Sequence, residues 1–155
     1  MPSQNPGIFR DFAEKQNVNF VEIDLHAGEK IPDLKNYDGL WVMGGSMNVW
    51  EEEEFPWLIE EKEAIRYAVD ELKLPFLGIC LGMQLMLNKS YEFGEIEGLN
   101  IIDGDVVKIP QINDKGQTHK IPHIGWNRII YKDDRITHGQ NEKSSMYFVY
   151  WSMLF

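Results

Sequence analysis

The sequence is short of cysteine, of basic residues and of long apolar runs. A single cysteine, Cys80, among 155 residues excludes a disulfide within the chain and is typical of a reducing compartment. Lysine and arginine number 15 against 25 aspartates and glutamates, so the net charge is −10 and nucleic acid is not an expected partner. No apolar run could span a bilayer and no secretory signal is present, so we expect a cytoplasmic protein without membrane attachment.

The length and composition predict one globular domain. A chain of 155 residues, 43% hydrophobic and 26% charged, can bury a core of its own. His119 and His123 are four residues apart, but Pro122 between them disrupts a helical metal-binding pair, and no cysteine or carboxylate is placed to complete a site. The sequence therefore predicts no metal site and no cofactor.

The most informative stretch surrounds the cysteine. The apolar run Phe76–Ile79 predicts a buried strand, and Leu81–Leu87 predicts a helix directly after it. Cys80 lies between them, flanked by Gly78 and Gly82, which is the pattern of a nucleophile elbow with sulfur in place of a serine hydroxyl. The glycines permit a sharp turn, and the helix dipole there favours a thiolate. A small buried cysteine in a core turn is the alternative; we favour the nucleophile.

A second glycine pair follows an earlier strand. Leu40–Met43 reads as a strand that ends in Gly44, Gly45 and Ser46. Paired glycines in such a place can direct backbone N–H groups into a cleft, as an oxyanion hole requires. An ordinary glycine turn is the alternative, and the pair alone does not decide between the two.

Local patterns predict alternating helices and strands in the first half and mainly strands in the second. The expected helices are 8–15 and 56–73, the latter amphipathic, and the expected strands are 18–25, 40–43 and 76–79. This order implies a parallel sheet whose ligands bind beyond the carboxyl ends of its strands. Further strands are expected at 98–102 and 105–109, joined as a hairpin by Asp103-Gly104, at 121–130 on a sheet edge, and at 146–151.

The stretch Gly78–Gln84, Gly-Ile-Cys-Leu-Gly-Met-Gln, resembles the nucleophile motif of class I, triad-type glutamine amidotransferases. The resemblance implies a glutaminase in which Cys80 attacks the side-chain amide of glutamine and ammonia is released. It implies that Gln84 holds the glutamine, and that Gly44, Gly45 and Leu81 serve the oxyanion and substrate. It also implies an α/β fold, a flavodoxin-like three-layer sandwich with a mainly parallel central sheet.

Two branches of the family are similar to different halves of the chain. Tyr91–Gly94, Gly98-Leu99 and Pro122–Asn127 resemble the glutaminase subunit of imidazole glycerol phosphate synthase, which passes ammonia to a barrel-shaped synthase partner in amino-acid biosynthesis. Trp50–Glu61 instead is similar to the GMP-synthetase-like amidotransferases. Glutamine as substrate and a synthase as protein partner are therefore expected, and the ammonia acceptor stays open.

The family's catalytic base, a His-x-Glu pair on a late strand, has no counterpart in the sequence. The residues two positions after His26, His119, His123 and His138 are glycine, isoleucine, glycine and glutamine. We therefore identify no catalytic histidine or glutamate. The favoured interpretation of His123 is a structural histidine on a strand, with its hydrogen-bonding groups satisfied within the fold.

The ends of the chain also depart from the family pattern. Tyr147–Val149 resembles the branch's Tyr-Phe-Val, but Tyr150-Trp151 stands where the family has His-Ser, and no strand pattern precedes the helix at 8–15. We expect one amidotransferase-like domain over residues 1–155, incomplete at both ends, that lacks the family's first strand and its His-x-Glu strand. Two alternatives stay open: a catalytically impaired or truncated remnant that serves as a binding module, and a cysteine hydrolase acting on γ-glutamyl substrates.

Overall fold

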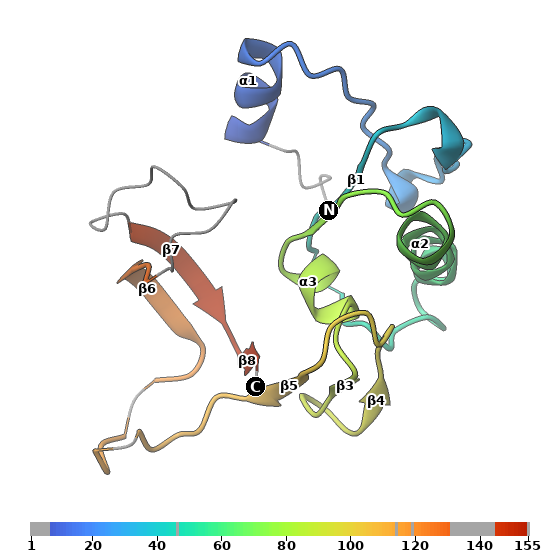
Figure 1. Cartoon of the computed structure of the whole chain (residues 1–155). Helices are drawn as coiled ribbons and strands as arrows, with labels where there is room; N and C mark the ends of the chain where they lie inside the picture. Colours follow the sequence, from blue (N-terminus) through green and yellow to red (C-terminus); the bar gives the residue numbers. More distant parts are fainter. Residues whose placement is uncertain (1–6, 46, 114, 119, 131–144, 155) are drawn as a thin grey trace.

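The computed structural model describes residues 7–45, 47–113, 115–118, 120–130 and 145–154. Helical elements and short strands alternate up to α3, and the elements described after it are all strands (Figure 1). The helical elements are α1 (Ile8–Lys15), η1 (Leu25–Ala27), η2 (Leu34–Asn36), α2 (Trp57–Arg66), η3 (Tyr67–Glu71) and α3 (Leu81–Leu85). The strands are β1 (Leu40–Val42), β2 (Phe76–Gly78), β3 (Lys89–Ser90), β4 (Ile96–Glu97), β5 (Asp105–Lys108), β6 (His123–Arg128), β7 (Ser145–Tyr150) and β8 (Ser152–Leu154).

A parallel pair of strands carries the predicted elbow. β1 and β2 run side by side, with Leu40 opposite Phe76 and Val42 opposite Gly78. The connection between them is α2, continued by the π-helical turn η3, and α3 follows β2. A parallel pair with a helical crossover is the basic unit of an α/β fold, so the predicted fold class is confirmed.

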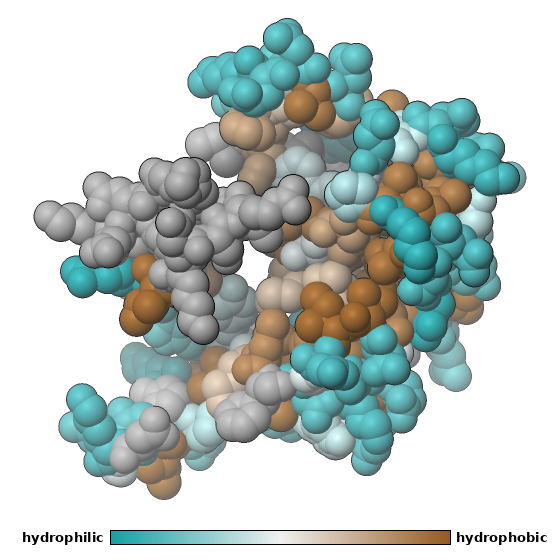
Figure 2. Space-filling view, in the orientation of Figure 1, coloured by the Kyte–Doolittle hydropathy of each residue, from teal (hydrophilic) through white to brown (hydrophobic). Residues whose placement is uncertain are grey.

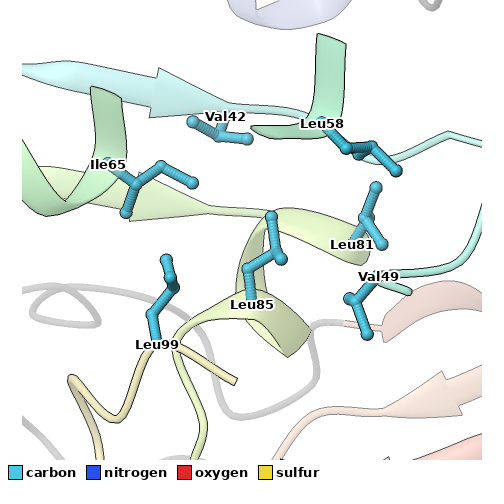
Figure 3. Packing of buried hydrophobic residues seen from close by; sticks show 7 residues of the cluster. All are labelled: Val42, Val49, Leu58, Ile65, Leu81, Leu85 and Leu99. Atoms are coloured by element: carbon cyan, nitrogen blue, oxygen red, sulfur yellow. The ribbon is translucent and has the colours of Figure 1, made fainter. Parts of the chain in front are cut away.

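The hydrophobic core lies between this strand pair and the two helices that flank it. Leu58 and Ile65 are seven residues apart on α2, so they share one face of the helix, and both are fully buried. Leu85 of α3 is fully buried as well. Figure 3 shows these side chains converging with the rest of the core cluster: Val42, Val49, Leu81 and Leu99. The predicted amphipathic helix is therefore confirmed, with its last turns wound as a π-helix.

A second sheet packs strands in the order β4-β3-β5-β8. The predicted strand at 105–109 is confirmed as β5, but the predicted hairpin is wrong. Residues 98–102 form no strand, because the N–H groups of Leu99 and Ile101 donate to Leu85 and Met86 at the end of α3. The hairpin is instead β3 with β4, whose strands are two residues long and too short to show a periodic pattern.

The strands predicted at 121–130 and 146–151 are confirmed as β6 and β7, and they pair with each other as a two-stranded antiparallel ribbon. Side chains directly opposite each other share a face, so Ile124 and Trp126 lie beside Val149 and Tyr147. These four large side chains are exposed, whereas the other face is half-buried over most of its length. We call the first the outer face of the ribbon and the second its inner face. The inner face holds His123, Gly125, Asn127, Met146, Phe148 and Tyr150.

The amino-terminal region holds the clearest correction. The helix predicted at 8–15 is confirmed as α1, but residues 18–24 form no strand and Val18, Phe20 and Val21 are exposed. A β-rich pattern becomes a strand only where a neighbouring strand shares its backbone hydrogen bonds, and no described strand pairs with this segment.

The hydrophilic residues gather along much of the outer rim of the molecule in Figure 2, and hydrophobic ones lie more towards the middle of that face. Within the described ranges, no helix is long and apolar enough to cross a membrane.

Candidate functional site

Cys80 occupies a strained turn between β2 and α3. Its backbone has φ 56° and ψ −112°, a region that residues with a side chain rarely adopt. The carbonyl of Cys80 accepts from the N–H groups of Met83 and Gln84, both at 3.0 Å, so the cysteine starts the helix that follows it. The thiol is exposed. The strained strand-to-helix turn predicted from Gly-x-Cys-x-Gly is therefore confirmed, and the side chain is accessible to a reagent.

Both glycines of the motif are required by close backbone packing. A Cβ on Gly78 would lie 2.5 Å from the carbonyl oxygen of Gly82, and a Cβ on Gly82 would lie 2.6 Å from that of Val42. Real Cβ atoms do not approach backbone oxygens so closely, and backbone cannot move aside as a flexible side chain can. The sequence pattern thus follows from two specific contacts: α3 against β2, and α3 against β1.

The first of the predicted oxyanion glycines lies directly beside the cysteine. A Cβ on Gly44 would come within 2.5 Å of the Cys80 Cβ, 2.9 Å of its Sγ and 3.3 Å of the Leu81 nitrogen. Gly44, which follows β1, therefore lies against both the Cys80 side chain and the start of α3. The neighbour of Gly45 is the Met47 side chain, which lies where a Cβ on Gly45 would point.

Gln84 contacts a strand from the far end of the chain. Its Nε2 donates to Ser152 Oγ at 3.2 Å, and Ser152 is buried. Gln84 lies one helical turn after Cys80, so β8 is anchored beside the elbow. Gln84, the predicted substrate-holding residue, thus has a hydrogen-bond partner within the chain, and this bond restrains its side-chain amide.

The segment just before β8 brings a tyrosine into the neighbourhood of the cysteine. Tyr150 is the last residue of β7 and lies on the inner face of the ribbon, directly opposite His123 of β6. Its ring packs against Phe148 at 5.1 Å between centroids. Burial raises the pKa of Tyr150 above its ordinary value, and the charge of Cys80 adds to that rise. Tyr150 is therefore within electrostatic reach of the thiol.

The predicted histidines divide into two groups. His119 and His138 lie outside the described residues. His26 lies in η1, whose residues belong to the amino-terminal half, and His123 lies in β6 with its Nε2 2.5 Å from Asn127 Nδ2. The two residues lie on the same inner face of β6, each two positions from Gly125. The favoured interpretation of His123 as a satisfied strand histidine is confirmed.

Sequence reasoning did not identify Tyr150 or Ser152 as site residues. Tyr150 stands where the resembling family branch has a histidine, and Ser152 follows it by two residues. The contact of Ser152 with Gln84 joins positions 68 residues apart, which no local pattern encodes. The one available signal was the alternation along β7, which places Phe148 and Tyr150 on the same side.

Comparison with known proteins points to one family. Residues 5–148 match the family model described as glutamine amidotransferase class-I. An imidazole glycerol phosphate synthase subunit HisH from Caldanaerobacter subterraneus subsp. tengcongensis is 46% identical over 145 residues, which is 86% of this chain and 62% of the relative. A subunit HisH 1 from Legionella pneumophila (strain Lens) is 64% identical over 56 residues, 36% of this chain and 26% of the relative.

A solved structure agrees in fold. The crystal structure of a glutamine amidotransferase from Thermotoga maritima matches 96% of this chain and 56% of its own with a TM-score of 0.67 and 22% sequence identity, which shows a shared fold. Against these relatives, the chain spans between about a quarter and about three-fifths of their length. The family model, in contrast, extends over most of the chain. The chain belongs to the class-I glutamine amidotransferase family.

Proposed function

We propose that this chain is a glutamine amidotransferase domain with Cys80 as its nucleophile. The observation that carries the proposal is the backbone of Cys80, held at φ 56° with the thiol exposed and with Gly44 close beside it. Such strain persists only where the surrounding structure imposes it, and it is concentrated at functional sites. A cysteine that served only the core would be buried in relaxed backbone.

The reaction follows from the groups around the thiol. The Sγ thiolate attacks the side-chain carbonyl carbon of glutamine, and the carbonyl oxygen gains the negative charge. The N–H groups of Gly45 and Leu81 are the proposed donors to that oxygen, and Gln84 is the proposed holder of the substrate. The carbon–nitrogen bond then breaks, the nitrogen takes a proton and leaves as ammonia, and water hydrolyses the thioester. The products are glutamate and a free cysteine.

The outer face of the ribbon is the proposed docking surface for a synthase. Ile124, Trp126, Tyr147 and Val149 expose their side chains together on one side of two paired strands, and Trp126 packs edge-on to Tyr147 at 5.6 Å. A contiguous exposed apolar patch of this kind marks a protein interface. The relatives that match this chain are named as synthase subunits, which supports a synthase as the occupant and ammonia as what the chain supplies.

A non-catalytic binding module is the second candidate. It is favoured by one observation on the sequence: no histidine among residues 1–155 is followed two positions later by glutamate. Without that base and its orienting group, attack by the thiolate is retained but proton transfer to the leaving nitrogen and from the incoming water is impaired. The two candidates therefore differ in turnover and agree in the reactivity of Cys80.

The test pairs labelling with turnover. The purified chain is treated with a chloroketone analogue of glutamine, and a parallel sample is assayed for ammonia release from glutamine, each against Cys80→Ala. We expect one label per chain at Cys80, and ammonia release about 10²–10⁴-fold below that of an enzyme with general acid–base catalysis. Labelling with no ammonia above the Cys80→Ala background would favour the binding module. A chain that takes up no label at Cys80 would contradict both candidates.

A further inference from the structure

The turn that follows the glycine pair after β1 is closed by one glutamate. The carboxylate of Glu51 accepts two hydrogen bonds from Asn48, one from its backbone N–H at 2.6 Å and one from its side-chain amide at 2.9 Å. The backbone N–H of Glu51 in turn donates to the Asn48 carbonyl at 3.3 Å. Three hydrogen bonds therefore join these two half-buried residues across the turn.

The same turn is anchored to the hydrophobic core. Val49, inside the turn, is buried in the core cluster, and Trp50 beside it packs against that cluster. The carbonyl of Glu51 accepts from the Phe55 N–H at 2.8 Å, which ties the turn to the residues that lead into α2. The hydrogen bonds between Asn48 and Glu51 thus act on a segment that the core already holds in place.

Met47 connects this turn to the proposed oxyanion donor. Its side chain occupies the position where a Cβ on Gly45 would lie, and it also packs against the core cluster. Glycine adopts many backbone conformations, so a hydrogen-bond donor supplied by a glycine N–H needs a restraint from its neighbours. Methionine has a flexible side chain, so it restrains Gly45 well only if its own backbone is held. Asn48, the next residue in the chain, is held by Glu51.

We propose that Glu51 is a positioning residue for the oxyanion donor of the amidotransferase reaction. The inference depends on the proposed function, in which the Gly45 N–H donates to the substrate oxygen. Glu51 holds Asn48 through both its backbone and its side chain, and it thereby fixes the turn from which Met47 reaches Gly45. A donor that is already oriented stabilises the tetrahedral adduct of glutamine more than it stabilises bound glutamine itself.

The test compares a ligand that forms a tetrahedral adduct with one that does not. Glutamate γ-semialdehyde is the aldehyde analogue of glutamine, and the Cys80 thiol adds reversibly to its carbonyl to form a thiohemiacetal, whose oxygen lies where the oxyanion forms. The affinity of each ligand is measured as protection of Cys80 from alkylation by iodoacetamide, quantified by mass spectrometry. Glutamine reports on binding of the substrate, and alkylation without a ligand reports on the reactivity of the thiol.

Two variants break the hydrogen bonds and a third restores them. Glu51→Ala removes the acceptor, and Asn48→Asp sets two carboxylates against each other. In both, we expect protection by the aldehyde to weaken at least about tenfold, less than the loss of about 10²–10³-fold caused by removing a whole oxyanion donor. Protection by glutamine and alkylation without a ligand should stay unchanged. Adding Glu51→Gln to Asn48→Asp exchanges the donor and the acceptor of the side-chain bond, and should restore protection by the aldehyde.

The control is Glu53→Ala, which removes an exposed glutamate two residues further on and should match the unmodified chain. Aldehyde protection in Glu51→Ala equal to that in the unmodified chain would overturn the assignment. So would an equal weakening of protection by aldehyde and by glutamine, which a general loss of structure predicts, or a double variant no better than Asn48→Asp alone. Failure of the proposed function gives a different result, because glutamine would then give no protection in the unmodified chain.

Discussion

The elbow region, which comprises β1, α2, β2 and α3, and the β6–β7 ribbon are both apolar in sequence, but the elbow region encloses a fully buried core and the ribbon does not. Leu58, Ile65 and Leu85 are fully buried around β1 and β2, while Ile124 and Trp126 on the ribbon stay exposed. The elbow strands are covered by α2 and α3, whereas the outer face of the ribbon is covered by none of the described residues. An apolar strand pattern thus predicts that one face of the strand is buried, but it does not show whether an element of the same chain or another protein buries it.

This difference in burial separates the region that stabilises the fold from the region that is available for association. The elbow region has a packed core beneath a strained, exposed thiol, an arrangement in which rigid packing maintains the strain. The ribbon holds no fully buried residue and presents its outer face to solvent. Changes in the elbow region should therefore act on folding, and changes on the ribbon should act on association.

The largest expected effect is the loss of core volume. Leu85→Ala should lower the free energy of unfolding by about 2–5 kcal/mol, since it leaves a cavity among fully buried side chains. The matched change on the ribbon, Ile124→Ala, should cost less than about 0.5 kcal/mol because that side chain is exposed. Denaturant unfolding of the two variants measures both. Equal losses of unfolding free energy in the two variants would show that Ile124 belongs to the same core as Leu85, and would contradict the difference described above.

Glycine-to-alanine changes sharpen the comparison at the level of backbone contacts. Gly78→Ala forces a Cβ to within 2.5 Å of the Gly82 oxygen, and we expect a loss of about 1–3 kcal/mol, typical of overpacking. Gly125→Ala on β6 meets nothing within 4 Å and should be neutral. Thermal unfolding provides the measurement. A neutral Gly78→Ala would mean that α3 is not held against β2 as described.

The exposed outer face should make the chain associate in the absence of a partner. Light scattering over a concentration series should show an average mass that rises with concentration, and Trp126→Lys should reduce that rise by placing a charge in the patch. Tyr67→Lys, an exposed aromatic away from the ribbon, is the control and should leave the rise unchanged. A clean monomer at high concentration would contradict this prediction.

The smallest expected effect is a pH dependence that originates on α2. Burial raises the pKa of Glu61 from 4.5 to about 7, partly opposed by Lys62, and its Oε2 has no hydrogen-bond partner among the described residues. The folded chain therefore holds a proton that the unfolded chain releases, so this stabilisation is complete below pH 4.5 and is lost as the pH rises through about 7.

The measurement compares unfolding midpoints at pH 5 and pH 8. Glu61→Gln should flatten the difference between them, because a neutral amide replaces the titrating carboxyl. Glu60→Gln, its exposed neighbour on α2, should leave the difference as it is. The same slope in Glu61→Gln and in the unmodified chain would show that the carboxyl titrates like an exposed one.

The elements around the elbow could be predicted because their signals are local. Gly-x-Cys-x-Gly is required by contacts within one turn and one neighbouring strand, and the spacing of Leu58 and Ile65 identifies the buried face of α2. The strand expected at 18–25 could not be excluded, since its pattern gives propensity but not a neighbour. The hydrogen bond between Gln84 and Ser152 joins positions 68 residues apart, and only the folded chain reveals it.

The central claim is that the elbow region holds Cys80 as a nucleophile in a site for glutamine, and protection from labelling tests it most directly. The chain is treated with a chloroketone analogue of glutamine in the presence of increasing glutamine, and in parallel with asparagine, and the label at Cys80 is quantified by mass spectrometry. The account predicts that glutamine slows labelling in a saturable way while asparagine, one methylene shorter, does so far less. Labelling that is indifferent to glutamine, or equally slowed by both amides, would contradict it.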